Sequence, residues 1–429
     1  MQKWILCGTL ILLTVGCGAA ASEGVSGGSV VTPSQSDSSG TRNWPNWMGP
    51  NLNGVSTESG WSTDWPEEGL PVAWTHQLGT GFSSVSIADG LLYSMGHTRG
   101  RETVWCLDAE SGEVVWKRFY DAELNPNLYE GGPGSTPTID DESVYSLSVD
   151  GRLMCLNRFD GSVVWEKKLQ TALDVGMHEW GFNGSPFILG DQLILEAGRV
   201  VSFDKRTGNK LWQSGVHRAG YGSVRAMTIE GRSMIVSLDC DGLRVSSAED
   251  GSEIAFNSWQ SPFRTNSTTP IVNGDRIFIS TGYQVGCGLF QLASEDSGFT
   301  LRPEYTSREM RNHFNNCILH QGYLYGFDGN SNLGRVVTLK CIDFATGEVQ
   351  WSKTGLGCGS LMIADQKLVI LSDKGQLVVA DASPDGFREL CRSPFLDGRC
   401  WTVPVLLNGR IYGRNARGRL VCVRLPSAS

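Results

Sequence analysis

Eight polar or aromatic side chains near the starts of repeated strand units could bind a ligand. Indole rings stack on flat ligands, amides both donate and accept hydrogen bonds, and guanidinium groups bind anions. The candidates are Trp180, Asn183, Arg225, Arg264, Asn266, His313, Asn316 and Trp401. They predict a site at a channel mouth for a small polar or anionic ligand, or for a peptide segment. The alternative is a water-filled channel whose polar side chains satisfy one another.

Catalytic chemistry has less support, and we assign no catalytic residue and no metal ligand. Calcium prefers carboxylate oxygens, yet no Asp or Glu occupies the inner-strand positions, which are Ser84, Ser135, Ser185, Arg225, Thr268, Asn316, Ser360 and Val403. His178 and Glu179 are adjacent, so in a strand they would point to opposite faces. Arg225 would also repel a bound cation.

A repeated pattern positions these residues. An Asx/Gly turn followed by a strand that ends in Trp recurs at Asp108–Trp116, Asn157–Trp165, Asp204–Trp212 and Asp343–Trp351. The first tight turn of each unit recurs about every 40 to 50 residues, which is the spacing of propeller blades with four short strands. The sequence therefore predicts an all-β, eight-bladed β-propeller of four-stranded antiparallel blades.

The last unit lacks its outer strand, and an unpaired strand at Pro71–Leu78 stands in front of the first unit. We predict that this N-terminal strand completes the last blade, so that the propeller spans 71–429 and no sheet edge is left open. The strand-closing tryptophans should cover the neighbouring blade, a structural role. They are Trp74, Trp116, Trp165, Trp212 and Trp351.

The N-terminus predicts export. Residues 1–21 combine a short basic start with an apolar run, as in a secretion signal. Two cleavage sites compete: after Ala21, or before Cys17 in a lipobox-like Thr14–Cys17, which would put a lipid on Cys17. Residues 22–43 are rich in Ser and Gly and predict a flexible tether. Residues 44–70 form an N-terminal extension.

The net charge limits which partners the protein can bind. The formal net charge of −9 argues against nucleic acid as a partner. We expect contact with a membrane only through a lipid anchor.

Among the 12 cysteines, Cys106, Cys155, Cys341 and Cys422 share one strand position in four different blades. They should be buried thiols too far apart to pair. Cys391 and Cys400 flank a loop and could pair.

The repeat Asp-Ala-x-Ser/Thr-Gly-x-x-x-Trp resembles the blade signature of pyrroloquinoline-quinone-type (PQQ-like) eight-bladed propellers over about residues 71–429. The signature is weak in three blades, which carry Ala255-Phe256, Arg302 and Leu390 at the Trp position. The leader Trp44-Pro-Asn-Trp47-Met-Gly-Pro50 is similar to that of exported propellers of planctomycete-type bacteria. The resemblance implies either quinone-dependent alcohol dehydrogenases, which use PQQ with calcium, or non-catalytic BamB-type lipoproteins.

The adjacent cysteine pair of those dehydrogenases is absent. We therefore expect an exported, non-catalytic binding or scaffold module of the cell envelope. It would be a monomer without a cofactor, and its partners would be envelope proteins or a small polar or anionic ligand. Two alternatives remain: a PQQ-dependent alcohol dehydrogenase with calcium, and a carbohydrate-binding propeller with Trp180 and Trp401 as stacking plates.

Overall fold

The computed structural model describes residues 43–296, 298–332 and 336–427. The predicted signal sequence, Cys17 and the predicted tether up to residue 42 lie outside these residues. No helix in the described part is both long and apolar enough to cross a membrane.

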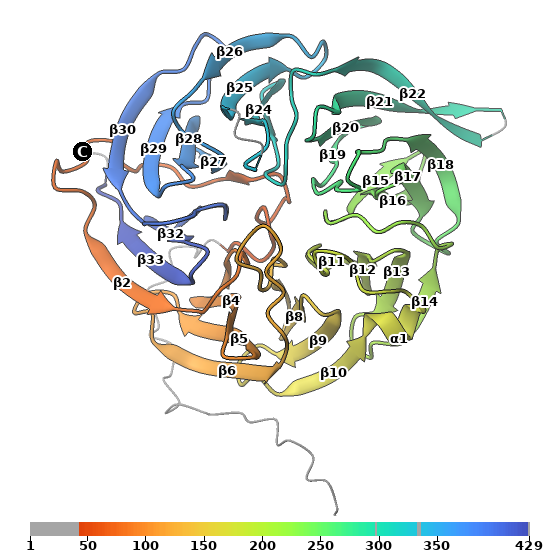
Figure 1. The fold of residues 1–429 in the computed structure, drawn as a ribbon, viewed down its shortest axis with the longest axis horizontal. Helices are drawn as coiled ribbons and strands as arrows, with labels where there is room; N and C mark the ends of the chain where they lie inside the picture. The colour runs from red at the N-terminus through yellow and green to blue at the C-terminus, as the bar shows by residue number, and fades with distance from the viewer. Residues whose placement is uncertain (1–42, 297, 333–335, 428–429) are drawn as a thin grey trace, which may run out of the picture.

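The described chain forms a ring of eight antiparallel, four-stranded sheets, as predicted (Figure 1). Blades one to four contain β3 (Ser86–Ala88), β4 (Leu91–Thr98), β5 (Arg101–Asp108), β6 (Val114–Asp121); β7 (Thr138–Asp140), β8 (Ser143–Leu147), β9 (Arg152–Asn157), β10 (Val163–Lys168); β11 (Phe187–Leu189), β12 (Gln192–Glu196), β13 (Val200–Asp204), β14 (Lys210–Gln213); and β15 (Arg225–Ile229), β16 (Arg232–Leu238), β17 (Gly242–Ser247), β18 (Glu253–Ser258). The short helix α1 (Leu169–Leu173) follows β10.

Blades five to eight contain β19 (Ile271–Asn273), β20 (Arg276–Thr281), β21 (Gly286–Glu295), β22 (Gly298–Ser307); β23 (Ile318–His320), β24 (Tyr323–Asp328), β25 (Thr338–Asp343), β26 (Val349–Lys353); β27 (Ser360–Ala364), β28 (Lys367–Leu371), β29 (Gln376–Asp381), β30 (Glu389–Pro394); and β31 (Val405–Leu407), β32 (Arg410–Arg414), β33 (Arg419–Arg424) with β2 (Val72–Gln77). In each blade the first strand listed is the inner one. All inner strands run in the same direction, so the segments that precede them gather at one face of the ring.

The Asx/Gly turn joins the third and outer strands of a blade and packs against the preceding blade. The Asp108 carboxylate accepts hydrogen bonds from the N–H groups of Glu110 (3.0 Å) and Ser111 (2.8 Å), which shapes the turn. Gly112 has a φ of +75°, and a Cβ there would lie 2.5 Å from the Trp74 ring. Only glycine fits, because it both adopts this conformation and leaves room for the indole of the preceding blade.

Each signature tryptophan is buried and donates its indole N–H to a backbone carbonyl of the next blade. The acceptors are Ala109 for Trp74, Arg158 for Trp116, Lys205 for Trp165, Ala248 for Trp212 and Ser383 for Trp351. A hydrogen-bonded N–H lets a large ring be buried without leaving an unsatisfied donor. The tryptophans therefore act between blades.

Two of the three blades with a weak signature carry a different residue at the tryptophan position than the repeat spacing predicts. In blade five the tryptophan position is filled by Tyr305, not Arg302: its ring lies against Gly347 and its hydroxyl donates to the Phe344 carbonyl (3.1 Å). In blade seven Cys391, not Leu390, pairs with Val379 at this position. The chain between the paired residues is longer in these two blades, from Leu289 to Tyr305 and from Val379 to Cys391, than from Cys106 to Trp116 in blade one. Counting residues by the regular spacing therefore misplaces the position.

The N-terminal strand closes the ring, as predicted. β2 pairs antiparallel with β33, with Trp74 opposite Cys422 and Thr75 opposite Val421. Arg414 of blade eight, 1% exposed, reinforces the closure from inside. Its guanidinium donates to the carbonyls of Gly79 (2.8 Å), Ser83 (3.1 Å) and Met95 (2.6 Å), which belong to the strand linker and to blade one.

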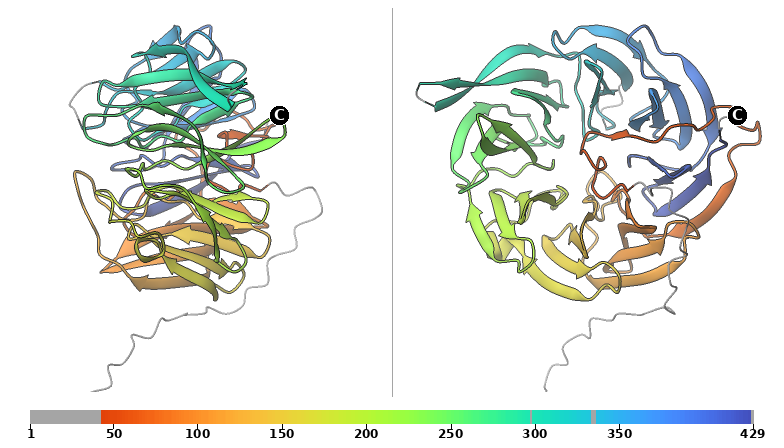
Figure 2. Two further views of the ribbon diagram at one scale, coloured as in Figure 1. Left: turned by 90° about the vertical axis from the view of Figure 1, so that its right-hand side faces the viewer. Right: turned by 180° about the vertical axis from the view of Figure 1, so that it is seen from behind.

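The extension crosses the far face of the ring, where the inner strands end (Figure 2). Trp44 bridges to Ile87 of blade one, and β1 (Val55–Ser56) pairs parallel with β27 of blade seven. The buried Glu58 then accepts hydrogen bonds from the N–H groups of Asn408 (3.0 Å) and Gly409 (2.8 Å) of blade eight. The extension thus spans the far end of the central channel.

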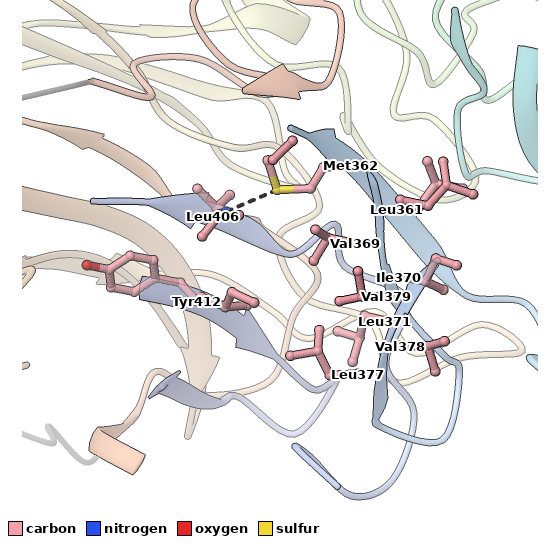
Figure 3. Packing of buried hydrophobic residues seen from close by; sticks show 14 of the residues in the cluster. Leu361, Met362, Val369, Ile370, Leu371, Leu377, Val378, Val379, Leu406 and Tyr412 are labelled. Atoms are coloured by element: carbon pink, nitrogen blue, oxygen red, sulfur yellow. Dashed lines mark hydrogen bonds between the residues drawn. The ribbon is translucent and has the colours of Figure 1, made fainter. Parts of the chain in front are cut away.

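The core lies between neighbouring blades. Figure 3 shows aliphatic side chains of blade seven packed beside those of blade eight, with the Leu406 N–H directed at the Met362 sulfur (3.0 Å). The four cysteines predicted to be buried are fully buried, free thiols. The suggested Cys391–Cys400 disulfide is not formed, since both cysteines are free: Cys391 lies in β30 opposite Val379, while Cys400 directs its thiol at the Asp397 carbonyl.

Candidate functional site

A cavity of about 240 Å³ occupies the mouth of the channel on the face opposite the extension, where the segments leading into the inner strands converge. Its wall is aromatic and its floor includes Trp47 of the extension. The aromatic lining residues are Trp47, Phe82, Tyr129, Trp180, Tyr221, Tyr283, Phe314 and Trp401. Pockets of this kind, concave with aromatic walls and a few polar groups, are typical ligand sites.

A complete belt of hydrogen bonds joins the eight blades beneath the mouth. In each case a Ser, Thr or Asn side chain from one blade bonds the next blade. The bonds are Ser84 N–H to Thr136, Thr136 N–H to Ser185, Ser185 N–H to Ser223, Ser223 N–H to Thr269, Thr269 N–H to Asn316, Asn315 amide to Ser360, Ser360 hydroxyl to the Trp401 carbonyl, and Ser84 hydroxyl to the Val403 carbonyl.

This belt gives a structural role to four of the inner-strand positions, Ser84, Ser185, Asn316 and Ser360. A hydroxyl or amide there satisfies a backbone group of the neighbouring strand, which would otherwise be buried without a partner. Asn316 uses both atoms of its amide in this way, since its nitrogen also donates to the Thr269 carbonyl (2.8 Å). Most of the belt residues also line the cavity, but the groups that form these bonds are already paired.

Five of the eight predicted site residues line the cavity: Trp180, Asn183, His313, Asn316 and Trp401. They come from three blade connections, β10–β11, β22–β23 and β30–β31, which the fold brings to one mouth. Asn183 holds the loop of Trp180 in place, because its amide nitrogen donates to the Trp180 carbonyl (2.7 Å).

The other three predicted residues, Arg225, Arg264 and Asn266, do not line the cavity. Arg225 is buried, donates to the Leu52 carbonyl (3.0 Å) and lies over the Trp47 ring (5.6 Å), so it holds the extension instead. Asn266 is fully buried and donates to the carbonyls of Asp239 and Trp259 (both 2.7 Å). Arg264 is exposed at a loop position with a φ of +54°.

The lining residues carry no formal charge, since no Asp, Glu, Lys or Arg is among them. Burial lowers the pKa of His313 to about 4, so its imidazole is neutral at physiological pH. Both ring nitrogens are occupied, Nε2 by the Tyr283 hydroxyl (2.9 Å) and Nδ1 by the Ser331 hydroxyl (3.2 Å). The cavity is therefore polar but uncharged, and its one imidazole is fixed in place.

The aromatic rings form two groups. Trp401 stacks on Phe82 (5.5 Å between centroids) and contacts Phe314 (4.5 Å), while the Arg399 guanidinium lies over it at 4.3 Å. Its faces are thus largely occupied. Trp180 is only partly buried and makes one edge contact, with Tyr221 at 5.6 Å. Trp180 is the ring better placed to stack on a ligand.

Sequence reasoning missed Trp47, Tyr129, Tyr221 and Tyr283 as lining residues. Tyr221 lies two residues before the belt residue Ser223, so its position was available from the repeat. Tyr283 lies in the β20–β21 connection with a φ of +55°, and the role of Trp47 depends on the path of the extension. Neither could be read from strand spacing.

The residues of this cavity do not fit a calcium-bound quinone. A calcium ion needs several oxygen ligands, usually including carboxylates. The lining contains no carboxylate. Nor does it contain a Lys or Arg to pair with the carboxylates of PQQ. In the described part of the chain, no three His, Cys, Asp or Glu residues cluster as a metal site.

Comparisons with known proteins agree with this architecture. A family model described as outer membrane protein assembly factor BamB matches residues 52–172 and 100–353, together more than half of the chain. The fold and this match define a PQQ-like propeller. The chain belongs to that family. No curated protein matches it.

Solved structures share the fold at low identity. BamB from Moraxella catarrhalis is 15% identical, with a TM-score of 0.60 over 83% of this chain and 99% of that one. The quinohemoprotein alcohol dehydrogenase from Comamonas testosteroni is 12% identical, with a TM-score of 0.63 over 89% of this chain and 80% of that one. Because an assembly factor and a dehydrogenase share this fold, the fold does not decide the function.

Proposed function

We propose that this protein is an exported, non-catalytic binding module of the cell envelope that holds an uncharged ligand at its channel mouth. The observation that carries the proposal is the cavity itself: aromatic walls, amide and hydroxyl groups, and no charged side chain. General acid–base and metal catalysis need titratable groups or carboxylate ligands in contact with the substrate. His313, the one imidazole of the lining, has both nitrogens occupied. Burial raises the pKa of the Tyr129 hydroxyl to about 12, which keeps it protonated at physiological pH.

The same observation narrows the ligand charge. The sequence favoured a polar or anionic ligand because of Arg225 and Arg264. With both outside the lining, an anion would lose its hydration without gaining a cationic partner. A neutral ligand does not incur this cost. The proposal therefore retains a small polar ligand and drops the anionic one.

Export is the second part of the proposal. Its support is the apolar N-terminal run, the Gly16-Cys17 pair and the similarity to BamB, whose name refers to outer membrane assembly. We expect Cys17 to carry lipid. Mass spectrometry of protein purified from a native envelope should find an acylated N-terminal Cys17. A mature N-terminus at Ser22 without acyl mass contradicts the anchor but not the export.

A thermal-shift screen tests the binding function. Purified protein is heated with a panel of neutral, anionic and cationic small molecules, and with PQQ plus CaCl₂. A ligand that binds only the native state raises the melting temperature in proportion to its affinity. We expect stabilisation by neutral compounds alone, lost in Trp180→Ala and kept in Trp65→Ala, which replaces a partly buried tryptophan outside the lining.

Three outcomes contradict the proposal. The first is stoichiometric binding of PQQ and calcium with alcohol-dependent reduction of a dye, which would establish the dehydrogenase alternative. The second is stabilisation by anions only. The third is stabilisation that is unaffected by Trp180→Ala, which would move the site away from the mouth.

A further inference from the structure

We infer that the uncharged ligand is a neutral carbohydrate, and that it stacks on Trp180 beside the loop that carries Asn127 and Tyr129. This inference rests on the proposed function and names the ligand class of the same cavity. A pyranose ring presents apolar C–H faces and hydroxyl edges. It is recognised by an aromatic plate flanked by groups that both donate and accept hydrogen bonds.

The plate is Trp180. It comes from the connection between β10 and β11, is partly buried, and contacts Tyr221 only at an edge. The backbone beneath it is fixed, because the Asn183 amide bonds the carbonyls of Trp180 (2.7 Å) and Gly181 (3.3 Å). A ring held in one orientation loses little entropy when a ligand stacks on it.

The hydrogen-bonding groups come from the neighbouring connection, between β6 and β7. The Asn125 amide joins the two connections by donating to the Glu179 carbonyl (3.4 Å). Asn127 and Tyr129 both line the cavity. In the part of the chain that the structure describes, neither the Asn127 amide nor the Tyr129 hydroxyl has a hydrogen-bond partner. Many other polar groups of the lining are paired, within the belt or with neighbouring groups at the mouth. Asn127 and Tyr129 are therefore available to a ligand, together with the unpaired Thr402 hydroxyl.

Charge separates this ligand class from others of similar shape. Nucleotides and acidic sugars carry anions that the lining has no Lys or Arg to pair with, and amino sugars carry cations that it has no carboxylate to pair with. Burying an unpaired charge is far costlier than burying a hydroxyl that finds a partner. A neutral glycan matches both the aromatic wall and the amide and hydroxyl rim.

A glycan array followed by calorimetry tests the inference. The array identifies which neutral glycan binds, and titration then compares maltose, cellobiose and N,N′-diacetylchitobiose with glucosamine dimers and uronic-acid disaccharides. We expect a neutral glycan to bind with a Kd below about 1 mM, and the charged sugars not to bind. Trp180→Ala should weaken binding at least about 10-fold, and Tyr129→Phe, which removes only the hydroxyl, about 3- to 10-fold. Trp65→Ala should leave it unchanged.

The outcomes separate this inference from the proposed function. If no neutral glycan binds but another neutral compound does so in a Trp180-dependent manner, the carbohydrate inference is wrong and the binding function stands. If no compound of any class binds, both fail. Glycan binding that survives both Trp180→Ala and Tyr129→Phe also overturns the assignment, and circular dichroism of each variant establishes that it is folded.

Discussion

The indole N–H of Trp74 donates to the carbonyl oxygen of Ala109 at 3.2 Å, which ties the outer strand of the last blade to the turn of the first. The two residues are 35 positions apart, yet this contact lies at the point where the ring closes. The Tyr412 hydroxyl donates to the same carbonyl at 3.1 Å. Blades eight and one are therefore joined by the same kind of contact that joins other neighbouring blades.

Loss of this contact should destabilise the whole ring. We expect Trp74→Ala to lower the free energy of unfolding by about 3–5 kcal/mol, the range for removing a large buried aromatic side chain. Urea denaturation followed by circular dichroism measures the change. Trp65→Ala is the control, since Trp65 is only partly buried. A loss below about 1 kcal/mol for Trp74→Ala would mean that the closure contributes little to stability.

Arg414 should be equally important to closure. Arg414→Met keeps most of the apolar volume but leaves the carbonyls of Gly79, Ser83 and Met95 without this donor. The Ser83 carbonyl keeps a hydrogen bond from the Ser94 hydroxyl (3.3 Å), so two acceptors lose this donor without that compensation. Unsatisfied buried acceptors cost about 1–3 kcal/mol each, so we expect a loss of at least about 2 kcal/mol. Arg417→Met changes an exposed arginine in the turn that follows β32 and should have little effect. Equal melting temperatures for the two variants would contradict this role.

Glu102 should make stability depend on pH. Its side chain is fully buried and accepts a hydrogen bond from the Tyr120 hydroxyl (3.0 Å). Burial, with a smaller contribution from the Asp150 carboxylate, raises the pKa of Glu102 from its ordinary 4.5 to about 7. The folded state thus binds more protons than the unfolded state between these values, and stability falls as the pH rises through this window.

The Glu102→Gln variant isolates this effect because it cannot ionise. We expect the variant to gain about 2–3 kcal/mol relative to the wild type between pH 5 and pH 8, as the wild-type carboxyl loses its proton. Urea denaturation at several pH values measures the difference. A constant difference across this range would show that Glu102 does not titrate in the window.

Arg225 should hold the extension on the far face. Arg225→Ala removes the bond to the Leu52 carbonyl and the contact with Trp47. We expect limited proteolysis to cleave residues 44–58 several-fold faster in this variant, with the ring intact. Arg264→Ala, at an exposed arginine, should digest like the wild type. Equal cleavage rates in the two variants would mean that the extension is held by its other contacts.

The periodic part of the structure could be predicted from sequence, because each blade repeats the same turn and the same inter-blade tryptophan. Asp108 and Trp116 are visible in any copy of the repeat. The errors occur where the period fails. The longer hairpin of β21 and β22 places Tyr305, not Arg302, at the blade-five aromatic position. The extension does not follow the repeat. Arg225 binds this extension instead of lining the cavity, and Trp47 of the extension lines the cavity.

The sequence predicted where the cavity lies, but not most of its aromatic lining or its lack of charge. Residues before the inner strands must converge, so Trp180 and Trp401 were found from spacing alone. Their partners were not, since Tyr129 and Tyr283 lie on connections whose paths depend on tertiary contacts. Net charge gave no guide either: the chain carries −9 overall, whereas the lining carries no charged side chain.

The path of the extension has a practical consequence. Trp44 bridges to Ile87, and Ser427 bridges to Trp61, so the described chain enters and leaves the ring on the side opposite the mouth. A fluorescent fusion or a sensor surface attached directly at residue 43 or 427 would lie on the side away from the opening. A support that holds the described chain at these two points therefore contacts the face of the ring away from the cavity.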